Sequence, residues 1–147
     1  MVKGQRGFTL IELLVCVAII GIIAAIVLPA SMQFIYNARV SRAVAELASI
    51  ERDILAYGSS AEGGFPATLA DLDSGVTQDP WGNAYVYVLN PAVGVARTNL
   101  ATPVNSDFDL YSIGQDGLTA VSCNDDESLD DIVRVNDGAW RGLAGSL

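Results

Sequence analysis

A single carboxylate, Glu12, lies near the start of an apolar run of 21 residues, FTLIELLVCVAIIGIIAAIVL, that begins at Phe8. A helix of about 20 apolar residues is long enough to span a bilayer. A carboxylate at that depth costs free energy unless it finds a partner. One interpretation is therefore that Glu12 pairs with a cation. The alternative is an acid close enough to the membrane interface to stay hydrated.

The second group of residues that could do chemistry is acidic. Between Asp107 and Asp137 the chain has nine acidic side chains and one basic side chain, Arg134. Calcium takes about six to eight oxygen ligands from carboxylates and carbonyls, so this segment could hold a calcium ion. The alternative is a solvated acidic loop with turns bonded to its own carboxylates. An EF-hand is excluded, because a loop counted from Asp107 puts Ser112 where it needs glycine and Leu118 where it needs glutamate.

Composition excludes several classes of function. The chain has no histidine, which excludes serine–histidine–aspartate and cysteine–histidine catalysis and histidine-bound metals. Acids on one loop without an aromatic-lined cleft do not indicate a glycosidase, so we expect no enzyme. The net charge is −9, and removal of Lys3 and Arg6 would leave 6 basic against 17 acidic side chains, or −11. Such an acidic surface is a poor nucleic-acid binder.

The basic residues before the apolar run predict how the chain lies in a membrane. Lys3 and Arg6 flank the run on its N-terminal side. Positive residues stay on the cytoplasmic side, so everything after Pro29 should lie outside the inner membrane. An uncleaved signal anchor is equally consistent with this hydropathy.

The helical pattern continues beyond the apolar run. Charged residues in this part, Glu51 among them, fall mostly on other faces than the apolar ones. Pro29 removes one helical hydrogen bond and should kink the helix without ending it. We expect one helix over residues 8–57, stopped by Gly58-Ser59-Ser60. Apolar residues recur in its second half at spacings of three and four, which predicts an amphipathic helix: Val40, Val44, Leu47, Ile50, Ile54 and Tyr57.

The rest of the sequence predicts short strands and loops. Alternating patterns predict strands at residues 84–88, 108–113 and 132–135, and residues 92–106 resemble a loop or an irregular hairpin. The predicted fold is α+β, with the long helix packed against a small antiparallel sheet of about three strands and a long C-terminal loop. The predicted parts are residues 1–7, a leader; 8–28, a transmembrane helix; 29–58, its amphipathic second half; and 59–147, a small periplasmic region.

The two cysteines predict no disulfide. Cys16 lies inside the apolar helix, and Cys123 lies in the polar C-terminal third. A disulfide would need their Cα atoms within about 6 Å of each other. The two cysteines could not come that close without disrupting one of the two regions.

The segment GFTLIELL resembles the processing site of the type IV pilin and pseudopilin family. The resemblance is strong from Gly7 to Pro29. It implies that a prepilin peptidase cuts between Gly7 and Phe8 and then methylates the new amine of Phe8. It also implies that Glu12 pairs with the Phe8 amine of a neighbouring subunit and fixes the axial stagger of a filament.

Several C-terminal segments are similar, in their order, to the major pseudopilins of type II secretion systems. They are DPWGNAYVY at residues 79–87, DFDLYSIGQDG at 107–117, Asp131-Ile132 and Trp140. In that family a calcium ion holds the last loop. The resemblance implies Asp116, one or both of Asp125 and Asp126, and the carbonyl of Ile113 as ligands.

This chain departs from the family pattern in the middle of the loop. It has Leu118-Thr119-Ala120-Val121 where a glycine pair is usual, and the loop is longer. The later ligands are therefore less well defined than Asp116. Asp130 and Asp131 are further candidates, and structural hydrogen bonding is the alternative for Asp131.

The resemblance implies a structural subunit of a helical homo-oligomer, a short periplasmic pseudopilus. Its partners would be the prepilin peptidase, other pseudopilins and an inner-membrane assembly platform, with no nucleic acid. The alternative is a subunit of a surface type IV pilus, used in adhesion, motility or electron transfer. A third hypothesis, a membrane-anchored binding module that never polymerises, would require an uncleaved leader.

Overall fold

The computed structural model describes residues 7–60, 64–72, 75–89 and 96–147. Lys3 and Arg6, on which the predicted orientation rests, lie outside these residues. The chain divides into two compact units, residues 1–37 and 38–147. Helix α1 (Leu10–Ser60) belongs to both units, and the strands belong to the second. The predicted α+β class is confirmed.

Helix α1 confirms the predicted long helix, with its ends moved by two and three residues. It continues through Pro29, because a proline inside a helix removes only one backbone donor. The kink expected there stays a prediction. The helix also includes Gly58-Ser59-Ser60, since the hydroxyls of Ser59 and Ser60 donate hydrogen bonds to helical carbonyls at 2.9 and 3.0 Å.

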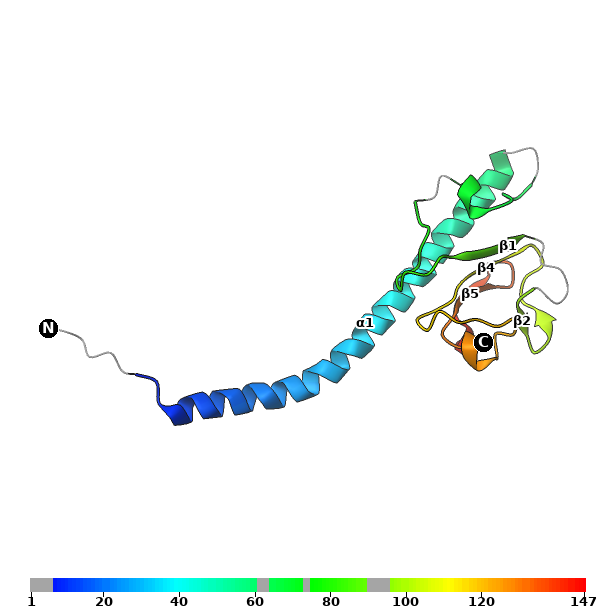
Figure 1. Ribbon diagram of the computed structural model, residues 1–147. Helices are drawn as coiled ribbons and strands as arrows, with labels where there is room; N and C mark the ends of the chain where they lie inside the picture. Colours follow the sequence, from blue (N-terminus) through cyan, green and yellow to red (C-terminus); the bar gives the residue numbers. More distant parts are fainter. Residues whose placement is uncertain (1–6, 61–63, 73–74, 90–95) are drawn as a thin grey trace. The chain divides into compact units, whose positions relative to one another are not determined.

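The main sheet has four antiparallel strands in the order β1-β4-β5-β6 (Figure 1). The predicted strands are confirmed as β1 (Val86–Leu89), β4 (Phe108–Ser112) and β5 (Ile132–Val135). Tyr111 of β4 pairs with Val86 of β1 on one side and with Val133 of β5 on the other. The fourth strand, β6 (Trp140–Leu143), was not predicted. Its sequence WRGL has no apolar alternation, and pairing with β5 holds it in place.

The segment predicted as a loop or irregular hairpin contains a small hairpin. Strands β2 (Thr98–Asn99) and β3 (Thr102–Pro103) pair with each other outside the main sheet. Leu100 and Ala101 connect them with φ values of 47° and 64°. A two-residue turn with positive φ at both positions matches the twist of a hairpin. Residues 92–95 of this segment lie outside the described residues.

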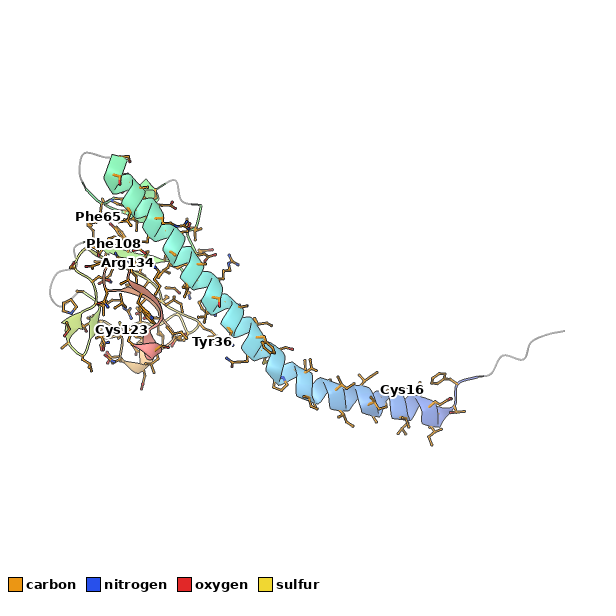
Figure 2. The ribbon with its side chains drawn as sticks, turned by 180° about the vertical axis from the view of Figure 1, so that it is seen from behind. Cys16, Tyr36, Phe65, Phe108, Cys123 and Arg134 are labelled. Carbon is orange, nitrogen blue, oxygen red and sulfur yellow. The ribbon has the colours of Figure 1, made fainter. Side chains whose placement is uncertain are left out.

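One face of the sheet packs against the second half of α1. The apolar residues predicted on one helix face, such as Leu47, Ile50 and Ile54, are buried there. Phe108 from β4 packs edge-on against Phe65 with ring centres 5.2 Å apart (Figure 2). Each such buried side chain contributes about 1.5–3 kcal/mol.

The opposite face of the sheet has its own small core. Side chains alternate along a strand, so Val133 and Val135 point away from the helix-facing Ile132. They pack with Val104 and with the buried Cys123. The hairpin and the loop before β5 thus cover this face. The described residues also form three short 3₁₀ helices: η1 (Leu69–Asp71), η2 (Asp126–Ser128) and η3 (Ala144–Ser146).

Candidate assembly site and C-terminal loop

Glu12 caps the N-terminus of its own helix. Its Oε2 accepts hydrogen bonds from the backbone N–H of Thr9 at 2.9 Å and from the Thr9 hydroxyl at 2.8 Å. The Thr9 hydroxyl in turn accepts the N–H of Glu12 at 3.3 Å. This reciprocal arrangement is a capping box. The spacing T-x-x-E before an apolar run is its sequence signal, and our sequence analysis missed it.

The residues on either side of the predicted cleavage point are open to solvent. Gly7 and Phe8 precede α1, and the Phe8 side chain is 74% exposed. A Cβ added to Gly7 would have no atom within 4 Å. The fold of this chain therefore does not require glycine at position 7. Any requirement for glycine must come from an enzyme that binds this segment.

The apolar half of α1 has no core of its own to pack against. Nearly every large apolar side chain from Phe8 to Ile35 is exposed. By length and composition, α1 is the one helix among the described residues that could cross a membrane. A shallow surface hollow lies along one helix face near its start, lined by Phe8, Ile11, Glu12, Val15 and Cys16. Phe8 and Glu12 both line this hollow, and the assembly role of Glu12 toward a neighbouring subunit stays a prediction.

The predicted calcium ligands do not converge. Asp116, Asp125 and Asp126 are exposed. The Oδ1 of Asp116 accepts the N–H of Leu118 at 2.8 Å, and Asp125 precedes η2 without a capping bond from its side chain. Over residues 7–60, 64–72, 75–89 and 96–147, no three Asp, Glu or Cys side chains form a group that could hold a metal ion. Asp116, Asp125 and Asp126 are thus not gathered into one such group, and calcium binding stays a prediction.

The other two acidic candidates have structural partners. The Oδ2 of Asp130 accepts the N–H groups of Gln115 at 2.6 Å and Asp116 at 3.1 Å. This holds the turn at Gly114, where φ is +68° and an added Cβ would meet Asp130 at 2.6 Å. Asp131 is fully buried. It accepts structural hydrogen bonds, which was the alternative considered for it.

Arg97 is the buried partner of Asp131. Its Nη2 donates to Asp131 Oδ2 at 2.6 Å, and its Nη1 donates to the Thr119 hydroxyl at 2.6 Å. Its guanidinium carbon lies 4.2 Å from the centre of the Tyr111 ring. Arg97 was not among the residues predicted from the sequence. The sequence held only an indirect indication of its role. Few basic residues follow α1 in this acidic region, so each of them was a candidate to pair with a carboxylate.

Burial and pairing act in opposite directions on Asp131. Burial raises the pKa of Asp131 to about 6, although the hydrogen bond from Thr119 and the charge of Arg97 lower it. Burial alone would lower the pKa of Arg97, but Asp131 raises it above its ordinary value. The charge of Arg97 thus offsets part of the cost of burying the Asp131 carboxylate.

A second buried charge network joins α1 to the sheet. Arg134 donates from its two Nη atoms to the Asp107 carboxylate, each at 2.7 Å, and its guanidinium lies over the Phe108 ring (Figure 2). Its Nε donates to Glu51 at 2.8 Å, and Arg141 also donates to Glu51. Glu51 is an exception among the charged residues that were expected mostly on the other faces of the helix, because it is 4% exposed and faces the sheet.

The turn at residues 79–83 is held by Asp79. Its Oδ1 accepts the N–H groups of Trp81 at 3.0 Å and Asn83 at 2.9 Å, and its Oδ2 accepts the Ser112 hydroxyl at 2.5 Å. The DPWGN turn, which precedes β1, is thus bonded to the end of β4. Both cysteines are free: Cys16 is exposed and Cys123 is buried.

The amino-acid sequence matches known proteins over both units. Residues 2–28 match the prokaryotic N-terminal methylation motif. Type II secretion system core protein G of Pseudomonas aeruginosa is 35% identical over 143 residues, 84% of this chain and 92% of that protein. Fimbrial protein Q of Moraxella bovis is 34% identical over 125 residues, 83% of this chain and 71% of that protein.

Some matches are confined to the N-terminal helix. The type IV major alpha-pilin of Moraxella bovis is 51% identical over 47 residues, 32% of this chain and 30% of that protein. No solved structure matches the chain.

Proposed function

Because this chain belongs to the type IV pilin and pseudopilin family, whose members are structural subunits and not enzymes, we propose that it is a subunit of a type II secretion pseudopilus. The observation that carries this proposal is the likeness to a type II secretion core protein over almost that protein's whole length.

The processing step follows from the open N-terminal segment. We propose that a prepilin peptidase cuts between Gly7 and Phe8 and methylates the Phe8 amine. Glycine lets the backbone approach the enzyme without a Cβ, and neither residue is buried by the chain itself. Before cleavage the subunit is stored in the inner membrane, with the residues after Pro29 in the periplasm.

The assembly step uses the charge that cleavage creates. Cleavage gives Phe8 a positive amine, and Glu12 lies on the same helix face as Phe8. Both Thr9 bonds end on Oε2 of Glu12, so Oε1 can accept an amine from a neighbouring subunit. Apolar helices gain little from each other in lipid, and a polar pair gives them a register. The product is a helical homo-oligomer that other pseudopilins and an inner-membrane assembly platform help to build.

A subunit of a surface type IV pilus is the second candidate. The fimbrial relative that aligns over most of this chain favours it. Deletion of the gene in the source bacterium separates the two functions. For a pseudopilus we expect secreted proteins to disappear from the medium while surface filaments remain in electron micrographs. Complementation with the wild-type chain is the control. Loss of surface filaments with normal secretion would contradict the proposal.

A further inference from the structure

The Arg97 guanidinium lies inside the C-terminal part of the fold. The Arg97 side chain is 4% exposed and its partner Asp131 is 0% exposed. The backbone N–H of Arg97 donates to Asp109 Oδ2 at 2.8 Å. The side chain of Arg97 bonds to Thr119 and to Asp131, the first and last residues of the segment 119–131. Thr119 also donates to Asp131 at 2.7 Å, so the two ends of this segment meet at Arg97.

Backbone bonds join the hairpin that carries Arg97 to the same segment. Thr98 donates its N–H to the carbonyl of Val121 at 3.0 Å, and its own carbonyl accepts the N–H of Cys123 at 2.8 Å. Leu100 donates its N–H to Asn124 Oδ1 at 3.0 Å. The hairpin β2–β3 thus holds residues 119–131 through main chain and side chain together.

Three carboxylates in or near this segment are already bonded to groups of the chain. Asp130 accepts two backbone N–H groups, Asp116 accepts one, and Asp131 accepts Arg97 and Thr119. A calcium ion at Asp131 would have to replace a fixed positive charge of the chain, and like charges repel.

We propose that Arg97 takes the part of a bound calcium ion from within the chain, so that the C-terminal loop folds and stays closed without calcium. The guanidinium compensates the buried Asp131 carboxylate and fixes the loop to the hairpin. This inference is independent of which filament the subunit builds, since it concerns the fold of one chain.

Thermal unfolding of the full chain in detergent micelles at neutral pH tests the proposal. Near-ultraviolet circular dichroism follows the packed aromatic core. We expect the same midpoint in excess chelator as in millimolar calcium chloride. A higher midpoint in calcium would overturn the proposal and support the calcium site predicted from the resemblance.

Variants test whether the charge of Arg97 is what matters. Arg97→Gln leaves the Asp131 carboxylate buried without its cation, and we expect the midpoint to fall by about 10 °C or more. Asp131→Asn added to Arg97→Gln removes that carboxylate and should restore part of the loss. Arg52→Gln, on the surface of α1, is the control and should leave the midpoint near that of the wild type.

Two results with the variants would also overturn the proposal. One is an Arg97→Gln chain that melts like the wild type. The other is a double variant that regains nothing, which would mean that Arg97 contributes packing and not charge. If Arg97→Gln alone does not fold, the double variant and the chelator comparison still decide.

Discussion

Glu51 on α1 and Arg134 on β5 form a buried ion pair, with the Arg134 Nε 2.8 Å from the Glu51 Oε1. The two side chains are 5% and 1% exposed. Arg141 on β6 donates to the other oxygen of Glu51 at 2.6 Å. One helical carboxylate thus accepts bonds from two strands, and the position of the sheet on the helix depends on it.

Replacement of Glu51 by Gln should strongly destabilise the second unit. It leaves the buried Arg134 without one of its anions, and breaking a buried pair costs about 3–5 kcal/mol. Urea unfolding of the full chain in detergent would measure the loss. Glu127→Gln, at an exposed position, is the matched control and should change stability little. Equal stability of the two variants would show that the network does not hold the helix to the sheet.

Replacement of Glu12 by Val should stop assembly but not cleavage. The change removes the acid that we propose pairs with the Phe8 amine, whereas Gly7 and Phe8 stay accessible. Thr9→Ala is the control, because it weakens the helix cap by about 1 kcal/mol and keeps the carboxylate. Gel mobility reports cleavage and electron microscopy reports filaments. Normal filaments from the Glu12→Val chain would rule out the assembly role.

Substitution of Gly7 should block processing without harming the fold. A Cβ at this position has no atom of the chain within 4 Å, so a loss of cleavage must come from contact with the peptidase. We expect Gly7→Ala to be cut and Gly7→Val and Gly7→Asp to resist, as seen by gel mobility on co-expression with a prepilin peptidase. Full cleavage of either larger variant contradicts this prediction.

The Asp131 carboxyl should make stability depend on pH in a defined direction. Burial raises its pKa to about 6, whereas the unfolded value is about 3.9. Between these values the native state keeps a proton that the unfolded state has released. The contribution of Asp131 to the free energy of unfolding therefore falls as pH rises from about 4 to about 6. Urea unfolding across this range should show a flatter profile for Asp131→Asn, and an unchanged slope would contradict the assignment.

The turn between β2 and β3 should gain stability from residues that accept positive φ. Leu100 and Ala101 hold φ values of 47° and 64°, which suit Asn and Gly better. The double change Leu100→Asn and Ala101→Gly should raise stability by about 1–2 kcal/mol. Ala48→Gly, inside α1, should lower it by about 1 kcal/mol. A fall in stability for the turn variant would mean that Leu100 packs in a way that its 82% exposure does not suggest.

Periodicity predicted most of the regular structure, because it depends on which side chains face the core. The spacing of Leu47, Ile50 and Ile54 predicted the helix face that the sheet covers. Strand β6 was not predicted, because its pairing with β5, and not the pattern of its own residues, makes it a strand. An irregular hairpin was one of the two predictions for residues 92–106, but its turn was not located, since Leu100 and Ala101 carry none of the usual turn signals.

The candidate site was predicted less fully. Gly7, Phe8 and Glu12 are close in sequence, so a local motif identifies them. The bond of Glu12 to Thr9 is also local, and the capping-box spacing could have predicted it. The partnership of Arg97 with Asp131 joins residues far apart in sequence, and only the folded sheet brings them together.

The buried, free Cys123 has a consequence for the conditions under which the subunit can fold. Ion pairs and backbone bonds close the loop around it, and the fold is complete with both sulfurs reduced. Folding of this loop therefore oxidises no thiol and needs no disulfide-forming catalyst. The described part of the fold can thus form under reducing conditions as well as oxidising ones.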